Sequence, residues 1–253
     1  MNKNKIIKQL NKNRAKNISL LGVIENYGIE SSLKYKNSIL ITVKTDHLWC
    51  YPASNSRDEL VELLKRFENK TNYFASLESW MIPVISKNRE IEWKLKTERL
   101  ILSEEAKKLS FLHNKAKQEE KIQTENDFEL RKLKSQDADF IFAHSHYQDF
   151  TSKAYIKERI AADCSAGIFI NEELAAWGLI HDDGAVGFIH VRENFRKNGY
   201  AHLIMKKLIK NKRENGKDVF LNVEPDNSKA KKLFYSLGFE FDRMISWIKL
   251  KEE

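Results

Sequence analysis

The stretch RKNGYA, at residues 196–201, places a glycine just ahead of a run with helical apolar spacing. It follows AVGFIHV (185–191), whose β-branched and aromatic residues predict a strand. The first amides of a helix have no partner within the helix, and the helix dipole adds positive charge there. Gly199 lets a phosphate approach this backbone, and Arg196 and Lys197 add positive charge. The spacing predicts a phosphate-binding turn, although taken alone it equally suits a tight turn without a ligand.

A second motif lies further along the chain. In NVEPDNSKAKKLFYSLGFEF (222–241) an asparagine leads a predicted helix that ends in Gly-Phe. Together the two motifs resemble those of the GCN5-related N-acetyltransferase superfamily, where a strand, [R/Q]xxGx[G/A] and a helix form the acyl-CoA site. The matching residues of the second motif are Asn227, Ala230, Leu233, Gly238 and Phe239. The resemblance covers about residues 128–251.

A finer resemblance links AAWGLIHDDGAVGFIHVRENFRKNGY (175–200) to the glycine N-acyltransferase-like, or FR47-like, branch of that superfamily. Members of this branch also carry a second α/β block ahead of the catalytic domain. The resemblance implies a mixed sheet that opens between the strands at 185–191 and 217–223 to admit the pantetheine arm of acyl-CoA. The acyl group, most simply acetyl from acetyl-CoA, would pass directly to an amine, with no metal ion.

The resemblance also implies which residues bind CoA. Backbone groups on the strand at 185–191 would pair with the pantetheine arm, and amides of 197–201 would hold the pyrophosphate. The implied CoA-binding residues are Ile189, Val191, Arg196, Lys197, Asn198, Gly199, Tyr200, Ala201, Asn227 and Phe234.

The catalytic positions match the superfamily less well. Many members carry a tyrosine four residues before the Gly-Phe glycine, placed to protonate the departing thiolate. Here that position is Phe234, and the tyrosine is Tyr235; one residue turns a helical side chain by about 100°. The glutamate base of the glycine acyltransferases would align with Ala185. A different proton acceptor is therefore needed.

His190 is our candidate for that proton acceptor. It alternates with Ile189 and Val191 on the predicted central strand. A histidine, with its ordinary pKa of about 6.5, can take a proton from an ammonium group directly or through water. The other candidates are His181, Glu193 and Glu224. A half-buried histidine without a catalytic role fits position 190 equally well.

The elements that must position these residues form a predicted α/β domain at 128–253. Three consecutive strands followed by a β-α-β-α-β run predict a mixed sheet flanked by helices. The predicted elements are a strand at 128–133, helices at 135–147 and 151–163, strands at 165–170, 173–180 and 185–191, a helix at 199–214, a strand at 217–223, a helix at 227–237 and a strand pair at 239–251.

Residues 1–102 are predicted to form a smaller α+β domain of unknown role. Its clearest element is an amphipathic helix at 56–70, which begins with the capping-box spacing of Ser56 and Glu59. A further helix at 18–27 and strands at 38–44, 47–52, 72–78 and 90–102 are predicted. The charged, apolar-poor run at 103–127 predicts a solvated helix or linker between the two domains.

Composition limits the partners and the location. The 44 Lys and Arg face 36 Asp and Glu along the whole chain, and this diffuse net charge of +8 does not favour nucleic acid as a partner. Two widely separated cysteines and the lack of a long apolar run favour a reduced, cytoplasmic protein that does not enter a membrane. His144 and His146 fall in a predicted helix, where a metal pair is not expected.

The function expected from these features is that of an acyl-CoA-dependent N-acyltransferase whose acceptor is a small-molecule amine or amino acid. One alternative is a protein that binds acyl-CoA without catalysis, which Phe234 and Ala185 favour. Another is an acetyltransferase of proteins or peptides that uses residues 1–102 as a docking module.

Overall fold

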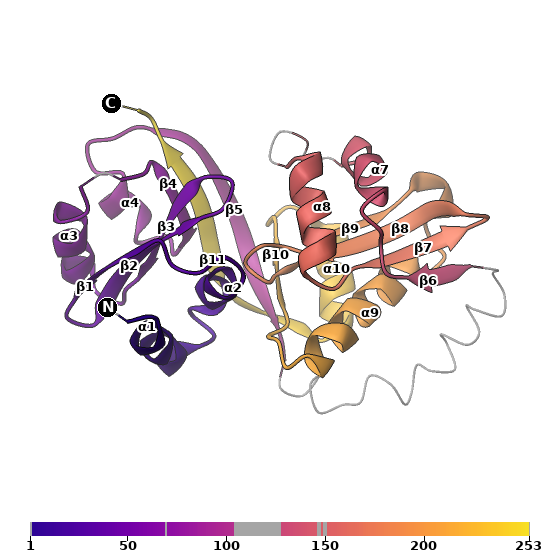
Figure 1. The fold of residues 1–253 in the computed structure, drawn as a ribbon, viewed down its shortest axis with the longest axis horizontal. Coiled ribbons are helices and arrows are strands. Elements are labelled where there is room, and N and C mark those ends of the chain that lie inside the picture. The colour runs from indigo at the N-terminus through magenta and orange to yellow at the C-terminus, as the bar shows by residue number, and fades with distance from the viewer. Residues whose placement is uncertain (1, 69, 104–127, 146–147, 149–150, 253) are drawn as a thin grey trace.

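The fold is built on one twisted sheet that runs through two lobes. A computed structural model describes residues 2–68, 70–103, 128–145, 148 and 151–252. Its strands form an 11-stranded sheet in the order β1-β2-β3-β4-β11-β5-β10-β9-β8-β7-β6. Figure 1 shows the lobes side by side, joined by the long strands β5 (Ile91–Leu102) and β11 (Phe239–Leu250). The linker predicted at 103–127 lies, apart from Ser103, outside the described residues.

The N-terminal lobe covers both faces of its strands with helices. Its elements are α1 (Lys3–Leu10), the 3-10 helix η1 (Asn11–Asn13), α2 (Ile18–Tyr27), β1 (Ser31–Tyr35), β2 (Ser38–Lys44), β3 (Leu48–Ala53), α3 (Arg57–Lys65), β4 (Tyr73–Leu77) and α4 (Ile82–Ile85). The strand β2 is apolar at successive positions because Ile39 and Ile41 pack on the side of α1 and α2, whereas Leu40 packs on the side of α3 and α4.

The predicted capping box of α3 forms in part. The Ser56 hydroxyl accepts a hydrogen bond from the Glu59 amide at 3.3 Å, as the spacing predicts. The Glu59 carboxylate does not complete the box; it accepts instead from the Ser38 hydroxyl at 2.7 Å and the Asn37 amide at 3.1 Å. It thereby ties α3 to the β1–β2 hairpin.

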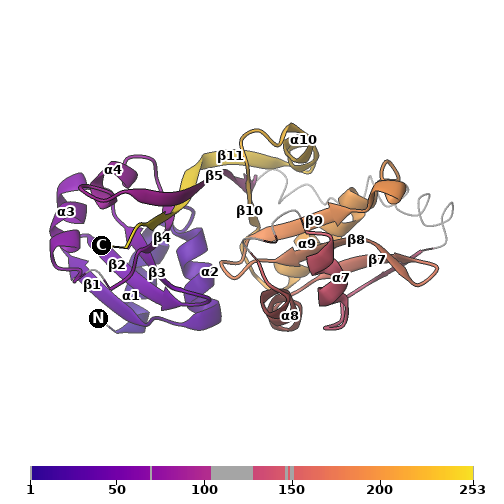
Figure 2. The same ribbon diagram turned by 90° about the horizontal axis from the view of Figure 1, so that it is seen from above.

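The C-terminal lobe has the mixed sheet and flanking helices that the sequence predicts. Its elements are β6 (Glu129–Arg131), α7 (Asp137–Ala143), α8 (Lys153–Ala162), β7 (Ala166–Ile170), β8 (Glu173–Ile180), β9 (Val186–Val191), the 3-10 helix η3 (Glu193–Phe195), α9 (Tyr200–Glu214), β10 (Phe220–Val223) and α10 (Ser228–Ser236). Helices α7 and α8 pack on one face around Trp177, and α9 and α10 pack on the other face around Ile204 and Phe234 (Figure 2).

The prediction of a strand pair at 239–251 is wrong. These residues form the single 12-residue strand β11, which pairs antiparallel with β5 over its whole length. The run has no glycine or proline at which a hairpin would turn, and register shifts between Phe241 and Arg243 and between Lys249 and Leu250 absorb the twist instead. The helix predicted at 135–147 is also shorter, as α7 ends at Ala143.

The two lobes share strands. The C-terminal strand β11 pairs with β4 at Ser246, Ile248 and Lys249, inside the N-terminal lobe. In return, the end of β5 pairs with β10 inside the C-terminal lobe. The domain boundaries predicted at residues 102 and 128 stay predictions.

Helix α2 of the N-terminal lobe packs directly against the turn between β8 and β9. A Cβ atom on Gly22 would lie 1.8 Å from the Asp183 carbonyl oxygen, so only glycine permits this approach. The Asn26 side-chain amide donates to the Asp182 carbonyl at 2.6 Å, and Tyr27 is hydrogen-bonded to Glu158 of α8. The lobes therefore meet through polar side chains as well as through shared strands.

Candidate active site

The sheet opens between β9 and β10. These parallel strands pair at a single position, Val186 with Leu221, and from Gly187 onward β9 keeps only its antiparallel partner β8. The Arg192 amide donates to the Ala175 carbonyl on β8 at 3.0 Å. Because backbone groups alternate along a strand, those of Val191 and Ile189 point to the opposite edge, toward β10. This opening lies where the resemblance to the N-acetyltransferases implies one, between the strands predicted at 185–191 and 217–223.

A bulge shapes β9 at the start of this opening. The register between β8 and β9 shifts between Trp177 and Leu179, and Phe188 has a left-handed φ of 53°. Gly178 lies opposite the bulge; a Cβ atom there would approach Ile189 Cδ1 to 2.7 Å. The bulge thus sends the Ile189 side chain into the space above Gly178, while the ring of Phe188 stays on the α8 side.

The turn before α9 presents a row of backbone amides. Gly199, the N-terminal cap, has φ 76° and ψ 1°, and Lys197 is also left-handed with φ 70°. Within the described part of the chain, the amides of residues 197–201 donate no hydrogen bond; those of His202 and Leu203 already donate to the Gly199 carbonyl. Alternating left-handed residues at a helix N-terminus form a concave array of N–H donors that suits an anion.

Arg196 connects this turn to β9. Its Nε atom donates to the Val191 carbonyl at 3.3 Å, and its guanidinium lies 3.6 Å from the Glu193 carboxylate. Both side chains are exposed, by 52% and 85%, so the ion pair is accessible to water and weak. Arg196 therefore remains available to an incoming anion.

The two CoA-binding residues predicted on α10 have clear structural contacts. The Asn227 side chain caps α10 by accepting from the Ala230 amide at 3.1 Å. Phe234 is 7% exposed and packs edge-to-face against Phe239. Tyr235, by contrast, is 45% exposed. The predicted 100° offset holds: the phenyl ring faces the core and the phenol faces solvent.

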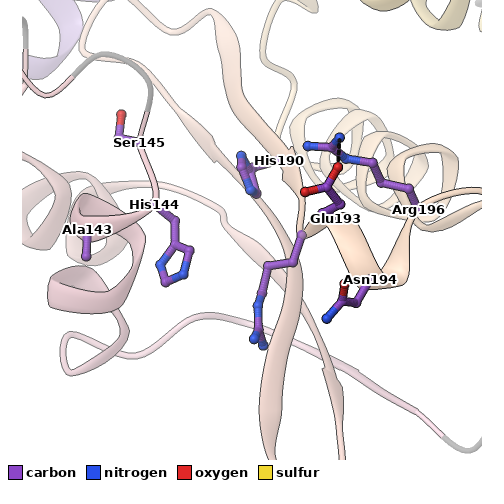
Figure 3. Close-up of a pocket in the computed structure, with 8 residues that line it drawn as sticks. Ala143, His144, Ser145, His190, Glu193, Asn194 and Arg196 are labelled. Carbon is purple, nitrogen blue, oxygen red and sulfur yellow. Dashed lines mark ion pairs between the residues drawn. The ribbon is translucent and has the colours of Figure 1, made fainter.

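His190 lines a pocket on the α7 side of the sheet (Figure 3). The pocket has a volume of about 470 Å³. Its lining residues are Ala143, His144, Ser145, His190, Arg192, Glu193, Asn194 and Arg196. The His190 ring stacks on Trp177 with ring centroids 4.4 Å apart, and Trp177 is only 1% exposed. His190 is thus partly exposed and lies on a buried indole, close to the turn that leads to α9.

A second group of polar side chains surrounds the turn between β8 and β9. The Tyr155 hydroxyl on α8 lies 3.4 Å from His181 Nδ1, donates to Asp182 Oδ1 at 3.3 Å and accepts from the Asp182 amide at 3.2 Å. The Arg159 guanidinium donates to the Ile180 carbonyl at 3.1 Å. Lys212 of α9 donates to the Gly184 carbonyl at 2.6 Å.

Burial changes the proton affinities in this group. Desolvation, with the charge of Asp183, raises the pKa of Asp182 to about 7. Burial lowers the pKa of His181, against the opposing effect of Asp183, and Arg159 lowers it further. Burial also raises the pKa of Tyr155 well above 10. At neutral pH, His181 is therefore a neutral imidazole beside a carboxyl group that titrates near that pH.

Nothing in the described part of the chain suggests a metal centre or a membrane span. No three of its His, Cys, Asp or Glu side chains are grouped so that they could bind a metal ion. None of its helices combines the length and the apolar character needed to cross a membrane. Of the histidines considered for a metal pair, His144 lies at the end of α7 and His146 lies outside the described residues.

Comparison with known proteins finds one family that resembles the part of the chain around this site. Residues 165–248, from the start of β7 almost to the end of β11, match the model of a family described as FR47-like protein. This segment is similar to FR47-like proteins and is referred to as the FR47-like domain. The FR47-like domain contains β9, the turn at 196–201 and α10, which carry the predicted CoA-binding residues. No curated protein matches the chain significantly.

Solved structures share the fold of the whole chain, including the part outside the FR47-like domain. A Drosophila protein superposes with a TM-score of 0.78 at 14% identity, covering 99% of this chain and 97% of that one. A GCN5-related N-acetyltransferase from Kribbella flavida gives 0.56 at 11% identity, covering 94% and 98%. A GCN5-related N-acetyltransferase-like protein from Streptococcus suis gives 0.55 at 12% identity, covering 97% and 99%. These likenesses concern the fold alone.

The sequence missed part of the polar group within and beside the FR47-like domain. His181 was a candidate from the sequence, whereas Asp182, Asp183 and Tyr155 were not. Tyr155 lies 26 residues from His181, on a helix that reaches the turn only in the folded chain. No local spacing could have linked them.

Proposed function

We propose that this protein is an acyl-CoA-dependent N-acyltransferase that transfers an acyl group, most simply acetyl, to an amine of a small molecule or amino acid. One observation carries the proposal: an opening in the middle of the sheet leads to a turn whose amides at 197–201 have no partner in the described chain. An anion would bind the amides, and a long arm attached to that anion would fill the opening. Acyl-CoA has both parts, a pyrophosphate and a pantetheine arm.

The turn before α9 would hold the pyrophosphate. Amides of Lys197, Asn198, Gly199, Tyr200 and Ala201 point out of the first turn, where the helix dipole favours negative charge. Arg196 would add a charge at the rim once it turns from Glu193, since that ion pair is exposed and weak.

The free edge of β9 would hold the pantetheine arm, whose amide groups can pair with Ile189 and Val191 as an added strand does. The Val191 carbonyl already accepts from Arg196 Nε, but a carbonyl oxygen has a second lone pair for the arm. Asn227 and Phe234 would contribute indirectly, by fixing the start of α10 and its packing beside the opening.

The pocket around His190 would hold the acceptor. Its volume of about 470 Å³ suits a small molecule. His190 would take a proton from the acceptor's ammonium group so that the neutral amine can attack the thioester carbonyl. The stacked Trp177 limits how far the imidazole can turn.

Binding of acyl-CoA without catalysis is the second candidate, and one observation favours it. The position of the superfamily's usual tyrosine is the buried Phe234, and the neighbouring Tyr235 is exposed to solvent. Turnover of acetyl-CoA with a panel of small amines and amino acids separates the two functions, because a binding protein would release no CoA. A peptide panel in the same assay tests the protein-acetyltransferase alternative.

Gly199→Asp tests the proposed pyrophosphate site. The carboxylate would repel the phosphates, so we expect CoA affinity measured by calorimetry to fall by at least ~10²-fold. Gly199→Asn is the isosteric neutral control, since asparagine tolerates the left-handed backbone. Gly216→Asp controls for strain, because Gly216 has φ 64° at the other end of α9 with no atom within 4 Å of its added Cβ. Equal CoA affinities for all three variants and the wild type would refute the proposed site.

A further inference from the structure

We propose that His181, held by Tyr155, carries the proton from the amine nitrogen to the sulfur of the departing CoA. The inference rests on the proposed function and adds the group that would complete its chemistry. At the position of the superfamily's usual tyrosine, Phe234 has no acidic proton, and the neighbouring Tyr235 is exposed to solvent, so neither residue supplies the sulfur with a proton.

His181 lies at the apex of the opening in the sheet. The last pair between β9 and β10 is Val186 with Leu221, and the next residue of β9 is Gly187. A Cβ atom on Gly187 would lie 2.1 Å from His181 Nε2, so the imidazole occupies the space that a side chain would fill. The imidazole is therefore placed over the first residue of β9 that has lost its β10 partner.

The surroundings of Gly187 stay accessible although they lie in the middle of an 11-stranded sheet. His181, Gly187 and Phe188 are all partly exposed, as is Asn222, the first residue of β10 after the last pair. The Asn222 side-chain oxygen is buried and has no hydrogen-bond partner in the described chain. A polar group that enters the apex would meet His181 from the β8–β9 turn and Asn222 from β10.

The length of β9 suits this position. Gly187 precedes Val191 by four residues, which is about 13 Å along a strand at ~3.3 Å per residue. A pantetheine arm anchored at the turn before α9 and extended along β9 would run toward Gly187. The bulge at Phe188, whose ring lies 4.7 Å from that of His181, turns the strand at the same point.

Tyr155 fixes the tautomer that the proton transfer requires. Its hydroxyl hydrogen goes to Asp182 Oδ1, so its oxygen accepts from His181 Nδ1–H, and Nε2 keeps a lone pair over Gly187. The groups that face His181 are Tyr155 and Arg159 from α8 and Asp182 and Asp183 from its own turn. Asp183 would stabilise the transient imidazolium, and Arg159 would oppose it.

The protons then balance. His190 removes one proton from the ammonium group, and the neutral amine forms a bond to the thioester carbonyl carbon. The nitrogen, now positively charged, gives its proton to His181 Nε2; the C–S bond breaks with its electron pair on sulfur, and His181 Nε2 returns that proton to the thiolate. The products are the amide and CoA thiol, and His181 is neutral again.

The first test observes the sulfur contact without any acceptor. His181 is followed by NMR of histidine-labelled protein, its resonance identified by its loss in His181→Gln. We expect CoA to shift the His181 resonance and desulfo-CoA, which lacks the thiol, to shift it much less, with both ligands bound equally in calorimetry. Equal shifts, or none, with CoA bound would overturn the inference and leave the proposed function standing. Failure of CoA to bind at all would overturn both.

The second test measures acetyl transfer in variants. His181→Gln should lower kcat by ~10²-fold or more with KM for acetyl-CoA unchanged, as loss of a proton-transfer group does. Gly187→Ala keeps the histidine but displaces its ring, and should also lower kcat; it guards against a folding defect in His181→Gln. His47→Gln, an exposed histidine in the N-terminal lobe, is the matched control and should match wild type. Wild-type kcat in both His181→Gln and Gly187→Ala would contradict the proposal.

Discussion

Single residues in unusual backbone conformations shape the proposed site. Lys197 and Gly199 are left-handed before α9, and Phe188 is left-handed in the bulge of β9. The glycine could be predicted because its role is local: only glycine adopts this conformation freely, and the pattern around it is contiguous. The conformation of Phe188 could not, since it follows from how β9 pairs with β8 around Gly178. Residues whose role depends on a partner strand leave little trace in a single sequence.

At the scale of single residues, we predict how substitutions of His190 and Tyr235 change the rate of acyl transfer. If His190 accepts the ammonium proton, His190→Ala should lower kcat/KM by ~10²–10⁴-fold and flatten the acidic limb of its pH profile. Tyr235→Phe should change the rate little, because the phenol is 45% exposed. Both are measured as CoA release over pH 5–9. Loss of turnover in Tyr235→Phe with normal turnover in His190→Ala would restore the usual tyrosine of the superfamily and reject our assignment.

Elements with strong local periodicity were predicted well, and elements that depend on distant partners were not. The apolar spacing of α3 and α9 and the β-branched run of β2 each mark an element by themselves. The last strand is different: β11 bends through two register shifts along β5, more than 130 residues away, and local sequence suggested a hairpin. The same holds for the polar group that joins α8 to the β8–β9 turn, because no local sequence spacing indicates it.

At the scale of the elements, we predict how the β8–β9 turn makes the stability of the protein depend on pH. In the folded protein the pKa of Asp182 is about 7 rather than its ordinary 3.8. Between these pH values the folded state holds a proton that the unfolded state has released, so rising pH weakens the fold through Asp182. Asp182→Asn removes this loss. We therefore expect the variant to gain stability relative to wild type from about pH 4 to pH 7, on the order of a few kcal/mol, since one pKa unit corresponds to about 1.4 kcal/mol.

The measurement is urea unfolding at a series of pH values. His181 has a lowered pKa, so its own effect runs the other way, weakening the fold as pH falls below about 6.5. That effect is present in both proteins and cancels to first order in their difference. Asp226→Asn changes an exposed aspartate and serves as the control. A constant difference between Asp182→Asn and wild type across this range would show that Asp182 titrates normally.

At the scale of the whole molecule, the two lobes are coupled by exchange of strands. The sequence suggests two domains separated near 103–127, and the fold of each lobe agrees with its local pattern. The pairing of β11 with β4 and of β5 with β10 joins them into one sheet. The buried Arg99 strengthens the join: it pairs with Asp242 of β11 at 2.6 Å and donates to the Ala15 carbonyl at 2.8 Å. A cut in the chain between the lobes is therefore not expected to separate them.

Limited proteolysis tests this expectation. The charged, apolar-poor run at 103–127 should be cut first, giving one fragment that ends with β5 and one that begins before β6. We expect the two fragments to elute together in size-exclusion chromatography, because β11 remains between β4 and β5 in one sheet, and to separate only in denaturant. Residues 1–102 expressed alone should unfold at a lower temperature than in the nicked complex, since β4 and β5 then lack their shared neighbour. Fragments that separate under native conditions, with 1–102 as stable alone as in the intact chain, would show instead that the N-terminal lobe is an independent domain.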